Sequence, residues 1–120
     1  MTKQETTGRR DLTFSAWIRV NLPDSSTGFQ ATDIDFVLRN WRTKKLMLLE
    51  IKTFHTPIKK WQQIVFSDLD VIFKNGIKSL LNWEYLGWHL VMFEGNDFTQ
   101  KVFFDDAEVT ENELKNILSF

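Results

Sequence analysis

The sequence predicts a mixed α/β domain in which helices pack against a small β-sheet. Two apolar segments rich in Ile, Val, Leu and Phe, residues 34–38 and 46–53, flank the short polar stretch RNWRTKK, which is the pattern of a β-hairpin. Apolar residues then recur at helical spacing from 58 to 73, and further strand-like segments follow. Strands that alternate with a long helix indicate a sheet with helices on it. A chain of 120 residues supports one core, so we expect a single domain over 1–120.

The N-terminal part begins with a polar segment, residues 1–8, that we expect to be a flexible arm. Residues 12–22 fit two interpretations: their apolar side chains alternate as in a strand, but Asp11 is also a good N-cap for a helix. We favour the helix, which would end before Pro23. The turn-forming stretch PDSSTG then predicts a loop.

A long helix and further strands are expected after the hairpin. Thr56 offers a capping hydroxyl, and Pro57 suits the first helical position. The helical spacing continues to Asn75-Gly76, a typical C-cap. The remaining expected elements are a short helix over 77–81, strands over 88–94 and 101–104, and a last helix over 111–118 that a Thr110/Glu113 capping box opens.

Composition excludes several classes of site. The chain has no cysteine, so disulfide frameworks and thiolate zinc sites are ruled out and a reducing compartment is favoured. Walker, GxGxxG, GxSxG and HExxH motifs are absent. No apolar run reaches the roughly 20 residues of a membrane span, and the N-terminus lacks an apolar signal segment. We therefore expect a cytoplasmic protein that does not enter a membrane.

Charged residues inside the two apolar segments indicate a functional site. Because side chains alternate along a strand, Glu50 and Lys52 share one face, as do Asp33 and Asp35 on the other segment. A hairpin centred near Arg42 would place Asp35 opposite Glu50, where like charges repel. A divalent cation would relieve this repulsion, and carboxylate and carbonyl oxygens suit Mg²⁺ or Mn²⁺. The alternative is an ordinary Glu50–Lys52 salt bridge on a solvent-exposed face.

The motif "DID" at 33–35, a hairpin, "EIK" at 50–52 and a following helix resemble the core of the PD-(D/E)XK nuclease superfamily, which includes restriction endonucleases, Holliday-junction resolvases and RecB-like nucleases. The resemblance implies a restriction-endonuclease-like mixed β-sheet flanked by helices. It also implies Mg²⁺-dependent or Mn²⁺-dependent hydrolysis of phosphodiester bonds in DNA.

Several residue roles follow from this resemblance alone. Asp35, Glu50 and the backbone carbonyl of Ile51 would hold the metal, and Lys52 would assist the attack on the phosphate. The motif's proline is missing, so Asp33 remains an alternative ligand to Asp35. In "QQIVF", Gln62 is similar to the glutamine of the QxxxY element of RecB-like members, and it is a further catalytic candidate.

The basic half of the chain is the half that carries this motif. Residues 1–60 contain 11 Lys and Arg against 6 Asp and Glu, a net charge of +5, whereas residues 61–120 have a net charge of −6. We expect DNA as the partner, with Trp41 as a candidate for stacking on bases. Because so short a chain covers little DNA alone, we also expect a homodimer or a larger nucleoprotein complex. The candidate phosphate contacts are Arg19, Arg39, Arg42, Lys44, Lys45, Lys59, Lys60 and His55. The alternative functions are a non-catalytic nucleic-acid-binding module and a protein-interaction subunit.

Overall fold

The computed structural model describes residues 12–120, and the chain divides into two compact units, Met1–Asp33 and Ile34–Phe120, each of which we describe by itself. In the first unit, helix α1 (Leu12–Asn21) is followed by the short 3₁₀ helix η1 (Ser25–Thr27). The preference for a helix over a strand at residues 12–22 is thus confirmed. The expected arm at residues 1–8 and the Asp11 cap lie outside the described residues.

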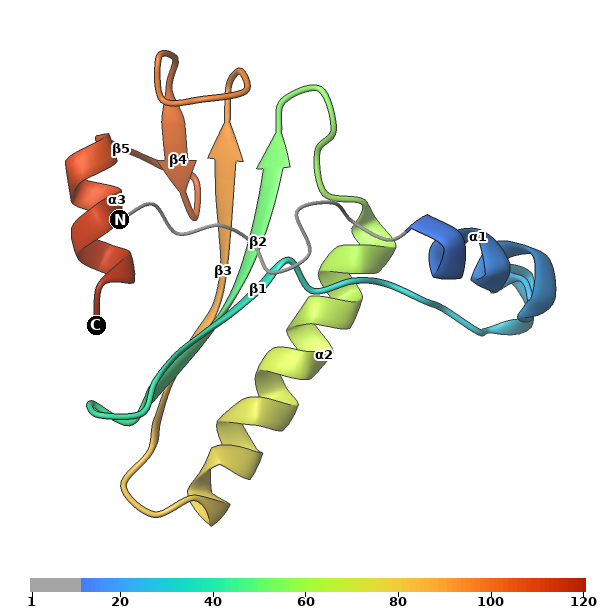
Figure 1. The fold of residues 1–120 in the computed structure, drawn as a ribbon, viewed down its shortest axis with the longest axis horizontal. Helices are drawn as coiled ribbons and strands as arrows, with labels where there is room; N and C mark the ends of the chain where they lie inside the picture. Colours follow the sequence, from blue (N-terminus) through green and yellow to red (C-terminus); the bar gives the residue numbers. More distant parts are fainter. Residues whose placement is uncertain (1–11) are drawn as a thin grey trace. The chain divides into compact units, whose positions relative to one another are not determined.

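The second unit is built on a five-stranded mixed sheet with the strand order β1-β2-β3-β4-β5 (Figure 1). The central pair, β2 and β3, is parallel, and every other neighbouring pair is antiparallel. The predicted α/β class is therefore correct. The strands are β1 (Phe36–Asn40), β2 (Lys45–Thr53), β3 (Glu84–Phe93), β4 (Val102–Phe104) and β5 (Ala107–Val109), and the helices are α2 (Lys60–Gly76), η2 (Ile77–Ser79) and α3 (Glu111–Leu118).

Helices α2 and α3 cover opposite faces of the sheet. On the α3 face, Leu49, Val91, Val102 and Leu114 form a buried apolar cluster. On the α2 face, the fully buried Phe66 stacks on Trp88 of β3, with ring centroids 5.3 Å apart. Because side chains alternate along a strand, Trp88 and Val91 must point to opposite faces. The sheet is thus a central layer with one apolar core on each side.

Four sequence expectations differ from the observed elements. Strand β3 begins at Glu84 rather than at Trp88. Helix α2 begins at Lys60 rather than at Thr56 and Pro57, because the Thr56 hydroxyl and amide bond to Thr53 in a turn instead of capping a helix. Strand β1 runs over Phe36–Asn40 rather than 34–38. Strand β5 was not expected, since it is only three residues long. The last helix and its Thr110/Glu113 capping box are as predicted.

A bulge in β3 bends the sheet at Gly87. Leu46 pairs with Tyr85 and Leu48 pairs with Trp88, so Leu86 and Gly87 together oppose one residue of β2, as in a β-bulge. Gly87 has a φ of +98°, a conformation that glycine adopts without steric cost.

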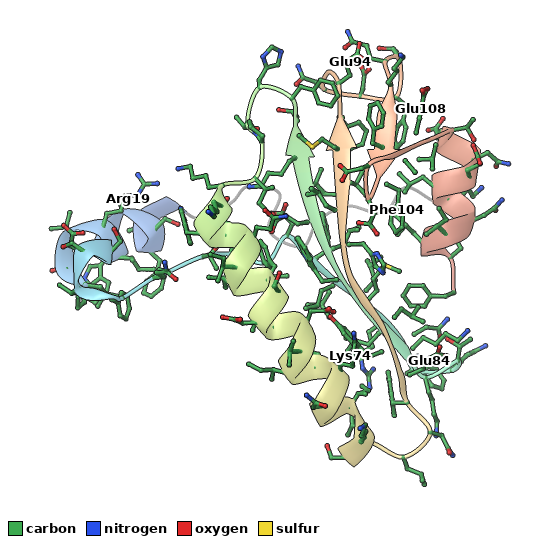
Figure 2. All side chains as sticks on the ribbon, turned by 180° about the vertical axis from the view of Figure 1, so that it is seen from behind. Arg19, Lys74, Glu84, Glu94, Phe104 and Glu108 are labelled. Atoms are coloured by element: carbon green, nitrogen blue, oxygen red, sulfur yellow. The ribbon has the colours of Figure 1, made fainter. Side chains whose placement is uncertain are left out.

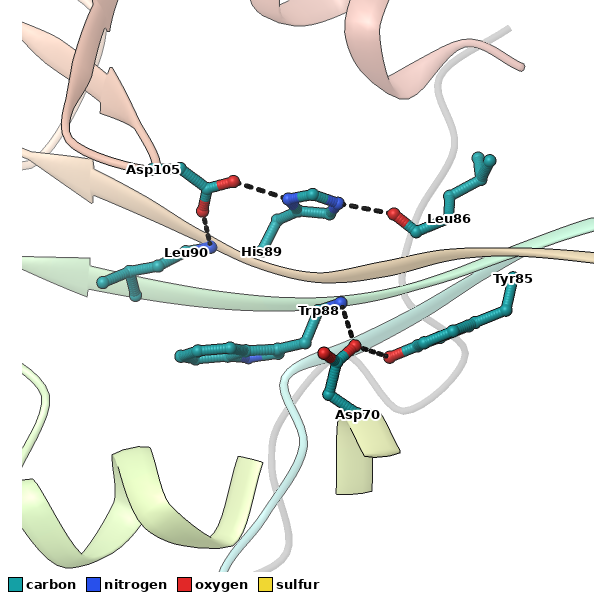
Figure 3. Close-up of polar contacts among 7 residues, drawn as sticks. All are labelled: Asp70, Tyr85, Leu86, Trp88, His89, Leu90 and Asp105. Atoms are coloured by element: carbon teal, nitrogen blue, oxygen red, sulfur yellow. Dashed lines mark hydrogen bonds and ion pairs between the residues drawn. The ribbon is translucent and has the colours of Figure 1, made fainter. Parts of the chain in front are cut away.

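Side chains satisfy the backbone groups that the bulge removes from the ladder (Figure 3). The Trp88 amide and the Tyr85 hydroxyl both donate to Asp70 Oδ1 of α2, at 3.0 and 2.8 Å. The ring of His89 bridges the Leu86 carbonyl oxygen at 2.7 Å and Asp105 Oδ2 at 2.6 Å. Burial, followed by the Asp70 carboxylate, raises the pKa of Tyr85. The bulge is thus tied to α2 on one face and to the β4–β5 turn on the other.

Gly87→Ala is expected to lower the free energy of unfolding by about 1 to 3 kcal/mol. The added methyl would force a left-handed backbone on alanine and would approach His89 Nε2 to 3.2 Å. Gly76→Ala is a matched control, because Gly76 has helical dihedral angles and nothing lies within 4 Å of its added Cβ. That variant should be neutral or up to about 1 kcal/mol more stable. Urea denaturation of both variants measures the difference, and equal effects would contradict the role of Gly87.

None of the helices within residues 12–120 has both the length and the apolar character that crossing a membrane requires.

Candidate functional site

Asp35 and Glu50 lie beside each other because of the register of the β1–β2 hairpin. Phe36 pairs with Leu49, so Asp35, which precedes Phe36, lies opposite Glu50, which follows Leu49. The predicted hairpin centre near Arg42 required this register. Asp35 is exposed just before β1, and its Oδ2 accepts the Ile51 amide proton at 2.9 Å. In an antiparallel ladder the N–H and C=O of one residue point to the same side. The Ile51 carbonyl therefore faces the same edge of β2 as Asp35.

Glu50 is the one buried charged residue within the described part of the chain, with 3% of its surface exposed. Its Oε2 is buried and has no hydrogen-bond partner among residues 12–120. Burial, and then the neighbouring Asp35 carboxylate, raise the pKa of Glu50 to about 8, against the opposing effect of Lys52. A buried carboxylate with an unsatisfied oxygen is costly. Asp35 lies within hydrogen-bonding reach of Glu50, so either a proton shared between the two carboxyl groups or a bound cation would relieve this cost.

Lys52 stands next to Glu50 on the α2 face of β2. Its Nζ is 4.0 Å from Glu50 Oε1, and its side chain is 20% exposed whereas that of Glu50 is 4% exposed. The expected alternative, a salt bridge on a solvent-exposed face, is therefore wrong about Glu50. The Lys52 ammonium group is therefore accessible to solvent, whereas the neighbouring Glu50 carboxyl group is buried.

The candidate residues after β2 lie in the turn that follows the strand and at the start of α2. His55 is exposed in the turn that follows the strand. Lys59 and Lys60 are exposed at the start of α2. The Gln62 Oε1 accepts the Lys59 amide proton at 3.3 Å, so this glutamine helps to cap the helix.

The basic hairpin lies at the other end of β2. Its cations are Arg39, Arg42, Lys44 and Lys45. Five residues separate Lys45 from Glu50 along a strand, which is about 17 Å. The structure therefore does not bring the hairpin cations to the carboxyl pair. Two further candidates, Arg19 and Asp33, belong to the first unit and are described apart from this site.

The groups that could hold a metal are few but fit a hard cation. Within residues 12–120, no three side chains of His, Cys, Asp or Glu gather as a metal-binding set. Asp35, Glu50 and the Ile51 carbonyl supply only oxygen ligands. Mg²⁺ is commonly held by one or two carboxylates with water and substrate phosphates completing its shell. The unsatisfied Oε2 of Glu50 agrees with such a ligand set, and the set excludes a structural zinc site.

The sequence interpretation missed Asp70 as a structural residue. Asp70 lies one turn after Phe66 on the face of α2 that packs on the sheet. The position of this acidic residue on the apolar face of a predicted helix was the feature of the sequence that could have indicated its structural role. His89 of β3, which bridges Leu86 and Asp105, is half-buried.

Comparisons of the chain with protein-family models, with curated proteins and with solved structures gave no match.

Proposed function

We propose that this protein is a Mg²⁺-dependent or Mn²⁺-dependent nuclease of the PD-(D/E)XK type that hydrolyses phosphodiester bonds in DNA. The observation that best supports this proposal is the buried Glu50 carboxyl group beside Asp35 and Lys52, with one oxygen that lacks a hydrogen-bond donor within residues 12–120. The strand order, with an antiparallel hairpin joined to a parallel strand and helices on both faces, supports the restriction-endonuclease-like fold that this proposal requires.

Asp35 and Glu50 would hold the cation together with the Ile51 carbonyl. Asp35 is oriented by the Ile51 amide and lies within hydrogen-bonding reach of Glu50, so one cation could contact both carboxyl groups. Glu50, whose pKa is about 8 in the metal-free protein, must lose its proton before it can coordinate. Binding of the cation therefore releases a proton and strengthens as the pH rises from 6 to 8.

Lys52 is the group next to the phosphate in this scheme. A bound Mg²⁺ supplies Lewis-acid polarisation of a phosphoryl oxygen and a lowered pKa for a coordinated water. The Lys52 ammonium, partly exposed and 4.0 Å from Glu50, orients the attacking water and stabilises the negative charge that develops on the phosphate. Glu50 keeps the ammonium in place through its own charge.

The decisive experiment incubates the purified protein with single-stranded, duplex and branched DNA in Mg²⁺ or Mn²⁺. Glu50→Gln and Lys52→Ala should each lower the cleavage rate by at least about 100-fold. The control variants Glu108→Gln and Lys101→Ala change exposed residues outside the site and should cleave as the unmodified protein does.

Two results would contradict the proposal in different ways. Cleavage that persists unchanged in Glu50→Gln or Lys52→Ala would show a contaminating nuclease or another site. Salt-sensitive DNA binding that ignores Mg²⁺ and never leads to cleavage would point instead to a non-catalytic binding module. A failure to bind any DNA would favour a protein-interaction subunit.

A further inference from the structure

The tip of the β1–β2 hairpin, residues 40–45, is an ordered platform. The Arg42 and Thr43 amides donate to Asn40 Oδ1 at 2.9 and 3.2 Å, and the Lys44 amide donates to the Asn40 carbonyl at 2.8 Å. The Asn40 side chain also donates to the Phe120 carbonyl at 2.6 Å. These bonds hold the backbone of the turn in one conformation, so the directions in which its side chains leave the backbone are set.

An exposed aromatic ring stands on this platform. Trp41 is 65% exposed, and the Arg42 guanidinium lies 5.0 Å from the centre of its ring. Beside the tip, the Arg39 guanidinium covers the ring of Trp83 at 4.3 Å. A large ring left in water on a rigid turn contributes little to folding. Aromatic rings and arginine planes are the surfaces on which proteins stack unpaired bases.

The charge of the tip suits a polyanion. Residues 39–45 contain four cations and no acidic residue. Lys74, in the last turn of α2, lies at the same end of the second unit as Glu84, whereas Glu94 and Glu108 lie at the opposite end (Figure 2). One acidic residue, Glu84, pairs with Lys45 beside the tip. The four cations outnumber this carboxylate, so a phosphate backbone that approaches the tip still meets net positive charge.

The backbone at Lys44 provides an independent observation. Lys44 has a φ of 59°, in the left-handed region where glycine is free of strain and other residues are uncommon. A lysine at this position costs stability that glycine would not. Asp105 and Asp106 in the β4–β5 turn also have positive φ, so this backbone conformation belongs to hairpin turns in general. What distinguishes position 44 is that it carries a cation where glycine would be less strained.

We infer that the hairpin tip binds single-stranded nucleic acid, with Trp41 and Arg42 stacking on an unpaired base and Lys44, Lys45 and Arg39 contacting the flanking phosphates. The inference deepens the proposed function and rests on it for the choice of nucleic acid as ligand. Stacking on Trp41 requires a base that is not paired, so the substrate must carry a single-stranded segment. The tip is about 17 Å from Glu50 along β2, which is about five nucleotides of stacked strand.

The test measures binding by fluorescence anisotropy, in EDTA to prevent cleavage. The probes are a labelled 12-nucleotide oligothymidine and a blunt-ended duplex of the same length. Trp41→Ala should weaken binding of the single strand about tenfold and leave binding of the duplex within twofold. Trp41→Phe should recover most of the loss, because it keeps a stacking ring. Val71→Ala, which changes an exposed apolar residue of α2, is the control and should change neither.

Lys44→Gly provides a second readout. This variant should melt at a higher temperature than the unmodified protein, yet it should bind the oligothymidine more weakly and with a smaller salt dependence. A merely structural lysine would give the rise in melting temperature with no loss of binding, and that result would overturn the role of Lys44.

Different results would contradict base stacking at the hairpin tip and nuclease activity at Glu50. Unchanged single-strand binding in Trp41→Ala, or an equal loss for the single strand and the duplex, would overturn the stacking platform. Glu50→Gln should retain single-strand binding while it loses cleavage. If the Trp41 effect is present but no cleavage occurs with the unmodified protein, the platform stands and the nuclease proposal falls.

Discussion

Glu50→Gln is expected to make the metal-free protein more stable at pH 8 and to flatten the pH dependence of its stability. Burial and Asp35 raise the pKa of Glu50 from 4.5 to about 8. Between these values the folded protein keeps the Glu50 proton and the unfolded chain has lost it. The contribution of Glu50 to stability is thus fully present below pH 4.5 and is lost as the pH rises to about 8, with a slope of up to about 1.4 kcal/mol per pH unit.

Glutamine has nearly the same shape and does not titrate, so this slope should disappear in the variant. At pH 8 the free energy of unfolding of the variant should be higher than that of the unmodified protein by about 2 kcal/mol or more. Urea denaturation at pH 5, 6, 7 and 8 measures the effect. Glu108→Gln, at an exposed position of β5, should leave the slope intact. A slope that survives in Glu50→Gln would mean that another group causes it.

The same reasoning predicts how Mg²⁺ acts on stability. A cation at Asp35 and Glu50 replaces the proton, so millimolar Mg²⁺ should raise the melting temperature more at pH 8 than at pH 6. Glu50→Gln should abolish most of this increase.

Phe66→Ala is expected to lower the free energy of unfolding by about 3 to 5 kcal/mol. Phe66 is fully buried and stacks on Trp88, so its removal leaves a cavity between α2 and the sheet. Phe98→Ala is the matched control, since Phe98 is 43% exposed and should cost less than about 2 kcal/mol. Equal costs for the two variants would contradict the packing of α2 on the sheet.

A milder variant connects this packing to the site. Phe66→Leu should keep the fold while it loosens the α2 face on which Glu50 lies. Greater access of water to Glu50 would bring its pKa closer to that of an exposed carboxyl group, and the slope of stability between pH 5 and 8 would decrease. An unchanged slope in Phe66→Leu would show that the burial of Glu50 does not depend on α2.

Local patterns predicted the hairpin register well. A short polar loop joins two apolar strands, and the length of the loop sets which residues face each other. The pairing of Phe36 with Leu49 therefore followed from the position of Arg42, and with it the proximity of Asp35 to Glu50. The capping box at Thr110 and Glu113 was equally local.

Local sequence patterns predicted element boundaries wrongly where two hydrogen-bond partners compete for one side chain. The Thr56 hydroxyl is a good helix cap, but Thr53 bonds to it in a turn, so α2 begins later. Strand β5 follows a two-residue turn of Asp105 and Asp106, both with positive φ. That conformation belongs to type I′ hairpins, whose usual signal is a glycine, and none is present in this turn.

The amino-acid sequence by itself determined that two strands form a hairpin and that Glu50 and Lys52 share one face of it with Asp33 or Asp35. Both follow from short-range periodicity and loop length. The structure places Asp35 next to Glu50. Only the tertiary structure decided that Glu50 is buried while Lys52 remains accessible, and that the basic tip lies about 17 Å from them. Burial depends on which elements pack over a residue, here the parallel strand β3 and helix α2, and no local pattern specifies those partners.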